Sequence, residues 1–300
     1  MEQVITMDTF YTQLCEKSHF DKKTVESALL FAKMCNMDKL AELLYEEKPA
    51  ILENRTVFFK DGFYPHDFFA FAREEIRKNR LCEETGFLYI YIALAKNALF
   101  EFRTLRFDDS IFFDTFKGIS QANMYHTKET GKNGIYDYLW LSGHLRANVI
   151  RLGAFEYQNG IFSFSEAPVI NGKTIKNGDM AVFLHVPFDT DFSKNSRHDS
   201  YEKASEIFGG NILVCDSWLL YPENARSLPE YSNIRSFAED FDIFHIDKDN
   251  CLEDLHHIFG RNCNFSNIDS LPDQTSLQQI YIKRLKNGLP SGSAAGIRVL

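Results

Sequence analysis

The chain has 300 residues, of which 44% are hydrophobic and 25% are charged, and its formal net charge is −9. This mixture is typical of a globular protein with a packed core, and the length suits one large domain or two of medium size. The acidic balance disfavours a nucleic-acid-binding protein, because such proteins present a basic face.

The chain shows no sign of export or of a membrane span. Its start lacks a basic segment followed by an apolar core, so a secretory signal is not expected. The most apolar stretch, residues 87–102, contains Lys96, Asn97 and Glu101 and is too short and too polar to cross a bilayer. The six cysteines include no C-x-x-C pair, so we expect reduced thiols, without a disulfide framework or a zinc site. We therefore expect a cytoplasmic protein.

The first third of the chain has the periodicity of amphipathic helices. Apolar residues from Val25 to Ala32 are spaced as one face of a helix, and Thr24 is the expected N-terminal cap. The turn signal Gly131 to Gly134 separates two later helices. By the same spacing we predict further helices over residues 40–44, 68–76 and 87–102, from Asp108 onward, and over residues 135–144.

From Asn148 onward the pattern changes to strands. Residues 149–158 and 161–165 are predicted to pair as a hairpin, because Asn159-Gly160 between them is a strong turn signal. The runs 180–186 and 212–220 are apolar, as in buried central strands. The other predicted elements are a turn at Asn171-Gly172, helices near 199–208, 233–241 and 275–286, a strand near 244–246, and a Gly- and Ser-rich tail over 290–296 that is flexible or folds over a site.

These elements predict an α+β protein with two domains. The first is a helical N-terminal domain over residues 1–147, and the second is a mixed β-sheet flanked by helices over residues 148–300. In the second domain, a strand, a polar loop, a helix and another strand form a crossover connection, which is right-handed by the general rule.

The polar loop ahead of the helix predicted near Asp199 is a candidate anion-binding site. Free N–H groups and the positive end of the helix dipole favour a phosphate at a helix N-terminus. One interpretation is a site for a pyrophosphate or phosphopantetheine group, and the other is a solvated polar loop. The residues just before the predicted helix are Lys194, Asn195, Ser196 and Arg197.

His185 is a candidate site residue at the end of the first apolar run. Pro187 follows it closely and cannot donate a hydrogen bond to a sheet, so the strand should end or splay there and leave backbone groups for a ligand. The alternative is a core histidine whose hydrogen bonds are satisfied within the protein.

A second candidate lies in the other apolar run, which is interrupted by the residues from Cys215 to Trp218. Buried polar groups cost free energy unless they are paired. On a strand, Cys215 and Ser217 face one way, and Asp216 faces the other. The structural alternative is that these groups bind neighbouring loops and that Trp218 anchors the core.

Several segments, taken in order, resemble a bacterial two-domain acyltransferase family. Its members join a helical N-acyltransferase N-terminal domain to a GNAT-like C-terminal domain. Upstream, Gly134-Ile135, Trp140-Leu141 and His144 resemble the end of the helical domain. The matching segments of the second domain are RLGAFEYQ at 151–158, LHVP at 184–187, CDSWLLYP at 215–222 and SNI at 232–234, ahead of Phe237.

The resemblance implies a GNAT-like sheet, a small amine acceptor and an acyl donor bound as a thioester, without a metal. The donor is acyl-CoA or the acyl-phosphopantetheine of an acyl carrier protein. In GNAT folds the pantetheine arm lies along a splayed strand and its phosphates meet the next helix. Carried over, this assigns donor binding to Leu184, Val186, Lys194, Asn195, Ser196 and Arg197, and catalysis to His185, Asp216, Ser217 and Cys215.

Two departures from the family pattern bear on substrates. The glycine-rich pyrophosphate loop is absent, since residues 195–200 contain no glycine, and this favours a carrier-protein donor over free coenzyme A. The first matching strand carries Ala154, Glu156 and Gln158 where the family often has Arg, Gln and Glu, which points to a different substrate choice.

The predicted reaction is direct transfer of the acyl group to the amine. His185, or Asp216 through a water molecule, takes a proton from the acceptor, and backbone N–H groups polarise the thioester carbonyl. Ser217 or Cys215 protonates the leaving thiolate, and a covalent Cys215 intermediate is less favoured because buried strand thiols are usually inert. The alternatives are a non-catalytic module that binds an acyl thioester or small ligand, and a structural partner subunit.

Overall fold

The structure is a computed structural model that describes residues 8–46, 50–51, 57–58, 65–188, 190–248, 253–261, 263–289 and 292–300. Expectations for the first seven residues, Asp189, Cys251 and Pro290 lie outside the described residues. The chain divides into two compact units, Met1–Asn159 and Gly160–Leu300, which we describe in turn. The domain division after residue 147 stays a prediction.

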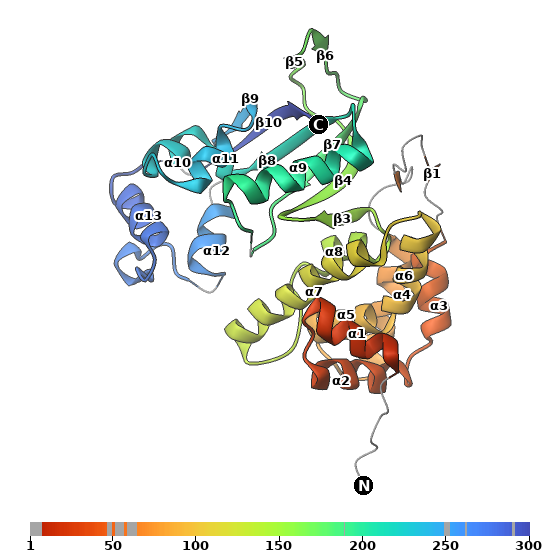
Figure 1. Ribbon diagram of the computed structural model, residues 1–300. Helices are drawn as coiled ribbons and strands as arrows, with labels where there is room; N and C mark the ends of the chain where they lie inside the picture. The colour runs from red at the N-terminus through yellow and green to blue at the C-terminus, as the bar shows by residue number, and fades with distance from the viewer. Residues whose placement is uncertain are drawn as a thin grey trace. The chain divides into compact units, whose positions relative to one another are not determined.

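The first unit is mainly helical, with the short paired strands β1 and β2 between α3 and α4 and a second pair of strands at its end (Figure 1). Its amphipathic runs bury their apolar faces in a core rich in phenylalanine, as their spacing predicts. The elements are α1 (Thr9–Ser18), α2 (Lys22–Ala32), α3 (Met37–Leu44), β1 (Ala50–Ile51), β2 (Val57–Phe58), α4 (His66–Lys78), α5 (Glu83–Ala93), α6 (Ala95–Thr104), α7 (Asp109–Thr130), α8 (Tyr138–Leu145), β3 (Val149–Leu152) and β4 (Phe155–Ile161).

Aspartate side chains cap three of these helices, and Asp8 is the cap of α1. Asp21 accepts a hydrogen bond from the backbone N–H of Thr24 at 2.9 Å, so α2 begins earlier than predicted and the assignment of Thr24 as the cap is wrong. Asp108 caps α7 at the predicted start. Gly131 ends α7 with a φ of 73°, which confirms the turn there.

The apolar stretch 87–102 is divided between two helices, where one was predicted. The break falls at Leu94, between α5 and α6. The carbonyl of Ala93 accepts a hydrogen bond from the Tyr11 hydroxyl at 3.2 Å, so a group at the break is bonded by α1. Lys96, one residue into α6, pairs with Asp8 just before α1. Contacts with another helix therefore favour a break that periodicity alone does not show.

The hairpin β3–β4 turns at a different place from the one predicted. Leu152 pairs with Phe155, so the turn is Gly153-Ala154, and Gly153 has the positive φ of 69° that a tight turn requires. Asn159-Gly160, the predicted turn, lies inside β4. A Cβ atom on Gly160 would lie 2.9 Å from the Phe183 ring, so glycine serves close packing at this position.

The sheet has six strands in the order β3-β4-β7-β8-β10-β9, and the end of β4, from Gly160, already belongs to the second unit. This is the mixed sheet with flanking helices that the sequence predicts. A separate two-stranded hairpin turns at Asn171-Gly172, as predicted. The strands of the second unit are β5 (Val169–Ile170), β6 (Lys173–Thr174), β7 (Met180–His185), β8 (Ile212–Ser217), β9 (Asp242–Asp247) and β10 (Ser293–Val299).

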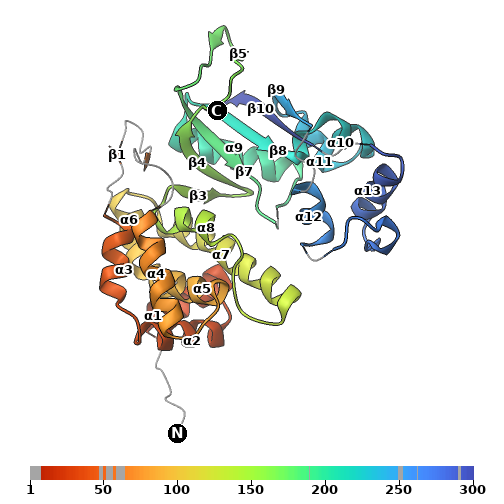
Figure 2. The same cartoon turned by 180° about the vertical axis from the view of Figure 1, so that it is seen from behind.

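Strands β7 and β8 are parallel and are joined by helix α9 (Lys194–Phe208). The helix covers one face of these strands in Figure 1, and Figure 2 shows the sheet from the other side. On that face the Arg298 guanidinium of β10 lies 3.9 Å from the centre of the Tyr201 ring of α9. The helix begins five residues before the predicted Asp199, because the Ser193 side chain caps it by accepting from the Ser196 N–H.

The tail that was predicted to be flexible or to cover a site is the strand β10. It lies between β8 and β9 and is antiparallel to both. Its small residues fit a crowded position: a Cβ atom on Gly296 would lie 2.7 Å from the Cβ of Phe241 and 3.1 Å from the Cδ1 of Ile243. Glycine and serine therefore reflect tight packing here, and the prediction of a mobile tail was wrong.

Short helices make up the rest of the second unit. The strand predicted over 212–220 ends at Ser217, and the next three residues form a 3-10 turn. The helix predicted over 233–241 ends at Ala238. These elements are η2 (Trp218–Leu220), α10 (Pro222–Ser227), α11 (Asn233–Ala238), α12 (Glu253–Phe259), η3 (Ile268–Ser270) and α13 (Ser276–Lys286), of which α10 and α12 were not predicted.

Candidate active site

The two parallel strands of the second unit pair over only part of their length. The paired residues of β7 and β8 are Val182 with Leu213 and Phe183 with Val214. Counting on from these pairs, His185 and Asp216 stand level at the ends of their strands, beyond the paired part. The pairing of β7 with β8 ends at Phe183 and Val214, whereas Asp216 still pairs with Ala295 of β10 on the other side of β8.

Strand alternation divides the predicted catalytic residues between the two faces of the sheet. His185 and Asp216 share one face, and Cys215 and Ser217 share the other, on which α9 lies. His185 is half-buried, and Asp216 is exposed. The structure thus brings the two candidate bases together and separates them from the two candidate acids.

Cys215 has the properties of a core residue. Its side chain is 1% exposed. Burial raises the pKa of the Cys215 thiol strongly, and the neighbouring charge of Asp216 raises it further. A thiol in this state is neither a nucleophile nor a useful acid at neutral pH, so the geometry favours a packing role.

Ser217 ends β8 and begins the following 3-10 turn. Its hydroxyl oxygen accepts a hydrogen bond from the Leu219 N–H at 3.2 Å. The residue is half-buried, so its O–H hydrogen remains available as a donor toward the strand end. Among the two candidate acids, Ser217 therefore has the better position.

An aromatic group that the sequence reasoning missed lies at the same strand ends. Phe188, three residues after His185, has its ring 5.3 Å from the His257 ring of α12, measured between centroids. Trp218, directly after Ser217, stacks on the same imidazole at 6.3 Å and 19°. No spacing in the sequence identifies this histidine, because Trp218 and Phe188 lie about 40 and about 70 positions before it and meet it only through the fold.

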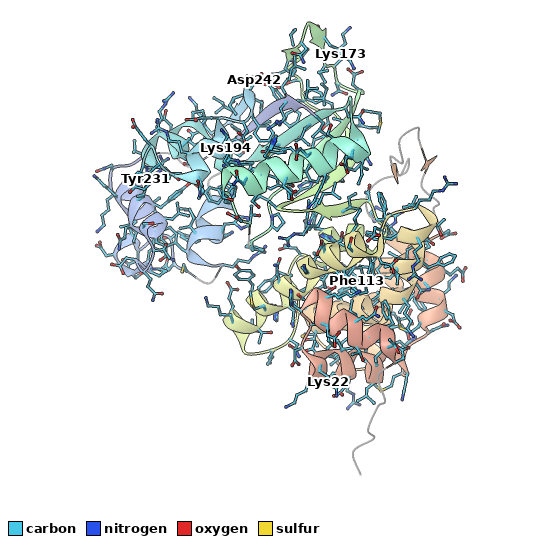
Figure 3. The ribbon with its side chains drawn as sticks, viewed as in Figure 1. Lys22, Phe113, Lys173, Lys194, Tyr231 and Asp242 are labelled. Atoms are coloured by element: carbon cyan, nitrogen blue, oxygen red, sulfur yellow. The ribbon has the colours of Figure 1, made fainter. Side chains whose placement is uncertain are left out.

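The candidate phosphate site lies at the first turn of α9, where Lys194 is labelled in Figure 3. Lys194 and Asn195 are exposed and Ser196 is half-buried, so these side chains face solvent at the helix start. Asp191 accepts from the backbone N–H and the hydroxyl of Ser193, at 2.8 and 2.9 Å, and these bonds lower its pKa. The loop has this aspartate where a typical GNAT loop has glycines.

Arg197, predicted to bind the donor, has a guanidinium group that is bound within the protein. Its side chain is 3% exposed, and its Nε lies 2.8 Å from Oδ2 of Asp240. It also donates to the Phe192 carbonyl at 2.6 Å and to the Ser236 hydroxyl at 3.0 Å. These bonds join α9 to the region of α11, so the geometry gives Arg197 a structural role, and direct binding of a phosphate by its side chain stays a prediction.

The first unit contains a separate buried polar pair. His144 of α8 and Glu156 of β4 are 0% and 5% exposed, and their Nε2 and Oε1 atoms lie 3.1 Å apart. Gly118 on α7 makes room for them, because a Cβ atom there would lie 2.9 Å from the Glu156 carboxylate. Both residues belong to segments of the family resemblance.

Two properties of the described residues, metal-binding groups and helix apolarity, bear on the chemistry. In the ranges that the structure describes, no three or more His, Cys, Asp and Glu side chains are arranged to hold a metal ion. Across those same ranges, no helix combines the length and apolarity that crossing a membrane requires.

Comparison with known proteins gives the family. The N-acyltransferase N-terminal domain matches residues 9–147, and the GNAT-like C-terminal domain matches residues 149–298. The search of curated proteins found no match.

Similar solved structures are acyltransferases with bound donors. A mutant acyltransferase in complex with octanoyl-CoA has a TM-score of 0.70 and 16% identity, covering 99% of this chain and 90% of that chain. An acyltransferase in complex with decanoyl-CoA and teicoplanin has a TM-score of 0.67 and 17% identity, covering 98% and 88%. An acyltransferase in complex with CoA and 10C-teicoplanin has a TM-score of 0.59 and 21% identity, covering 72% of this chain and 66% of that one.

At these identities the structures show a shared fold. The family matches together cover both units described above and account for their order, helices first and mixed sheet second. The chain therefore belongs to the acyltransferase family in which an N-acyltransferase N-terminal domain precedes a GNAT-like C-terminal domain.

Proposed function

We propose that the protein transfers an acyl group from acyl-CoA to the amino group of a small molecule, at the ends of β7 and β8. The observation that carries this proposal is the parallel pair whose pairing stops at Phe183 and Val214, followed by a helix that begins with Lys194. The strand backbone at these ends suits the amides of a pantetheine arm, and the helix N-terminus suits its phosphates.

Acyl-CoA is the preferred donor in this proposal. Solved structures of the same fold hold CoA, octanoyl-CoA or decanoyl-CoA, which supports a CoA thioester even without a glycine-rich loop. Lys194 supplies a cation at the first turn of α9, and Asn195 and Ser196 supply polar donors. An acyl-phosphopantetheine on a carrier protein offers the same thioester and is the second candidate donor.

A small-molecule amine is the proposed acceptor. Two of the similar structures contain teicoplanin or 10C-teicoplanin with their donor, which supports a small-molecule acceptor for this fold. A neutral amine attacks a thioester carbonyl directly, so no covalent enzyme intermediate is needed. This agrees with the buried, unreactive state of Cys215.

The proposed chemistry assigns a role to each accessible group at the strand ends. Backbone N–H groups beyond Phe183 polarise the thioester carbonyl, and Leu184 and Val186 contact the donor. The amine nitrogen bonds to the carbonyl carbon, the C–S bond breaks, and the proton that the amine loses is balanced by the proton that the CoA sulfur gains. In this proposal the Ser217 hydroxyl donates a proton to the sulfur, and a base at the strand ends receives the proton from the amine; the candidates from the sequence are His185 and Asp216.

The test uses octanoyl-CoA with a panel of amines, namely benzylamine, D-glucosamine, glycine methyl ester and hydroxylamine. We expect release of CoA thiol together with an amide product that mass spectrometry identifies. Retention of octanoyl-CoA without an amide from any amine would contradict the enzyme and favour the non-catalytic binding module. Transfer only from octanoyl-acyl carrier protein would move the donor assignment to the carrier protein.

A further inference from the structure

We propose that His257 of α12 is the residue that takes the proton from the acceptor amine, a role that rests on the proposed function. Neither the sequence pattern nor the family resemblance assigns a role to this histidine. Three observations support this role: His257 lies over the ends of two strands, it is exposed, and two aromatic rings hold it.

The imidazole of His257 contacts the continuations of both parallel strands. The Phe188 ring, 5.3 Å away between centroids, belongs to the segment that leaves β7 after His185. The Trp218 ring, 6.3 Å away, belongs to the residue that follows the end of β8. A group that touches both continuations stands beyond the last residue pair of β7 and β8, which is where the proposed function puts the thioester carbonyl.

The rings hold the imidazole in a defined orientation. Trp218 lies nearly parallel to it, at 19°, and Phe188 is tilted by 50°. The small angle to Trp218 and the contact with Phe188 define the plane in which the imidazole lies. Trp218 is itself fixed by Tyr281 of α13, whose ring meets it edge-on at 6.1 Å. A fixed aromatic support reduces the orientational freedom that a base would otherwise lose in the reaction.

His257 is also accessible, as a base for an external amine must be. It is exposed, whereas His185 is half-buried within β7. The adjacent His256 is half-buried and directs its ring toward Phe265, at 5.3 Å, on another side of α12. Imidazole is the side chain that exchanges protons most readily near neutral pH. Of the two adjacent histidines, His257 therefore combines the required position with the required chemistry.

In the proposed step, an unprotonated ring nitrogen of His257 accepts one proton from the amine as its nitrogen bonds to the thioester carbon. The C–S bond breaks, and the thiolate takes a proton from the Ser217 hydroxyl or from solvent. The imidazolium then releases its proton to solvent or back to that hydroxyl. The products are an amide and the free CoA thiol, and His257 returns to its starting form.

The test compares His257→Asn with the matched control His256→Asn, using octanoyl-CoA with benzylamine and with hydroxylamine. Benzylamine is mostly protonated at neutral pH and needs a base, whereas hydroxylamine is mostly unprotonated. We expect His257→Asn to lower kcat/KM for benzylamine by about 100-fold or more, as expected when a general base is lost. Its activity with hydroxylamine and its KM for octanoyl-CoA should stay near the wild-type values, and His256→Asn should keep activity with both amines.

A second variant separates proton transfer from packing. In His257→Ala, added imidazole should restore part of the activity with benzylamine, and the melting temperature should show that the variant is folded. Full activity of His257→Asn with benzylamine would overturn this inference and leave the proposed function intact. Equal loss with both amines, without rescue by imidazole, would also overturn it. If the wild-type protein acylates no amine, the proposed function fails, and the inference fails with it.

Discussion

Replacing Arg197 by alanine tests whether this buried cation holds the second unit together or binds the donor. The guanidinium joins α9 to Asp240 by an Nε–Oδ2 distance of 2.8 Å and donates to a backbone carbonyl and a hydroxyl nearby. Alanine removes all of these donors at once. It leaves the Asp240 carboxylate, which is 24% exposed, without its main cation.

The expected loss of stability follows from the burial of Arg197 in its ion pair with Asp240. Removing one partner of a buried ion pair costs about 3–5 kcal/mol, but water reaches the Asp240 side chain and replaces part of the lost bonding. We therefore expect a loss of about 2–4 kcal/mol, which lowers the melting temperature by roughly 5–15 °C in a protein of this size. Lysine at this position should recover only part of the loss, because a point charge cannot replace the planar set of donors.

Thermal unfolding and the KM for octanoyl-CoA are measured together. The control is Arg235→Ala, because Arg235 is more exposed and lies 3.9 Å from Glu239, so its loss should cost below about 1 kcal/mol. The structural reasoning predicts a lower melting temperature for Arg197→Ala with little change in KM below that temperature. An unchanged melting temperature together with a strongly raised KM would refute it and restore Arg197 as a phosphate ligand.

Three further results are expected. Iodoacetamide should label Cys215 only after unfolding, because burial raises the pKa of its thiol and excludes the reagent. Peptide mass spectrometry measures the labelling, and rapid labelling of the folded protein would contradict this expectation. Gly296→Val should destabilise the protein by about 1–3 kcal/mol in urea unfolding, because its Cβ would meet Phe241 at 2.7 Å, and an unchanged midpoint would speak against this packing. A hydrogen bond from His245 lowers the pKa of Glu166 to about 2, so its stabilising contribution is complete above about pH 4.5 and is lost as the pH falls toward 2. The melting temperatures of wild type and Glu166→Gln should therefore converge over that range, and a constant difference would refute the assignment.

The strands that carry the candidate site could be predicted from the sequence because each lies in an apolar run. The predicted runs 180–186 and 212–220 form strands over Met180–His185 and Ile212–Ser217. The end of β7 at His185 was also expected, from Pro187. His257 could not be predicted, since a contact between α12 and the strand ends depends on tertiary packing, which no local spacing encodes.

Two of the errors in the fold share one physical origin, which is the double use of glycine. Gly160 and Gly296 were interpreted as signs of a turn and of a flexible tail. Both lie in strands where a Cβ atom would collide with an aromatic residue, Phe183 in one case and Phe241 in the other. The same residue type permits a positive φ at Gly153 and close packing at these two positions, so only the three-dimensional surroundings decide between the two uses.

The place of β10 in the sheet has a consequence for synthesis of the chain. Strands β8 and β9 are neighbours in sequence order, yet β10 separates them and pairs with both. While the ribosome is still making residues 218–292, the edge of β8 that later pairs with β10 has no partner strand. Exposed strand edges of this kind invite pairing with other chains. We therefore expect the second unit to need protection by chaperones until residues 293–299 have emerged and completed the sheet.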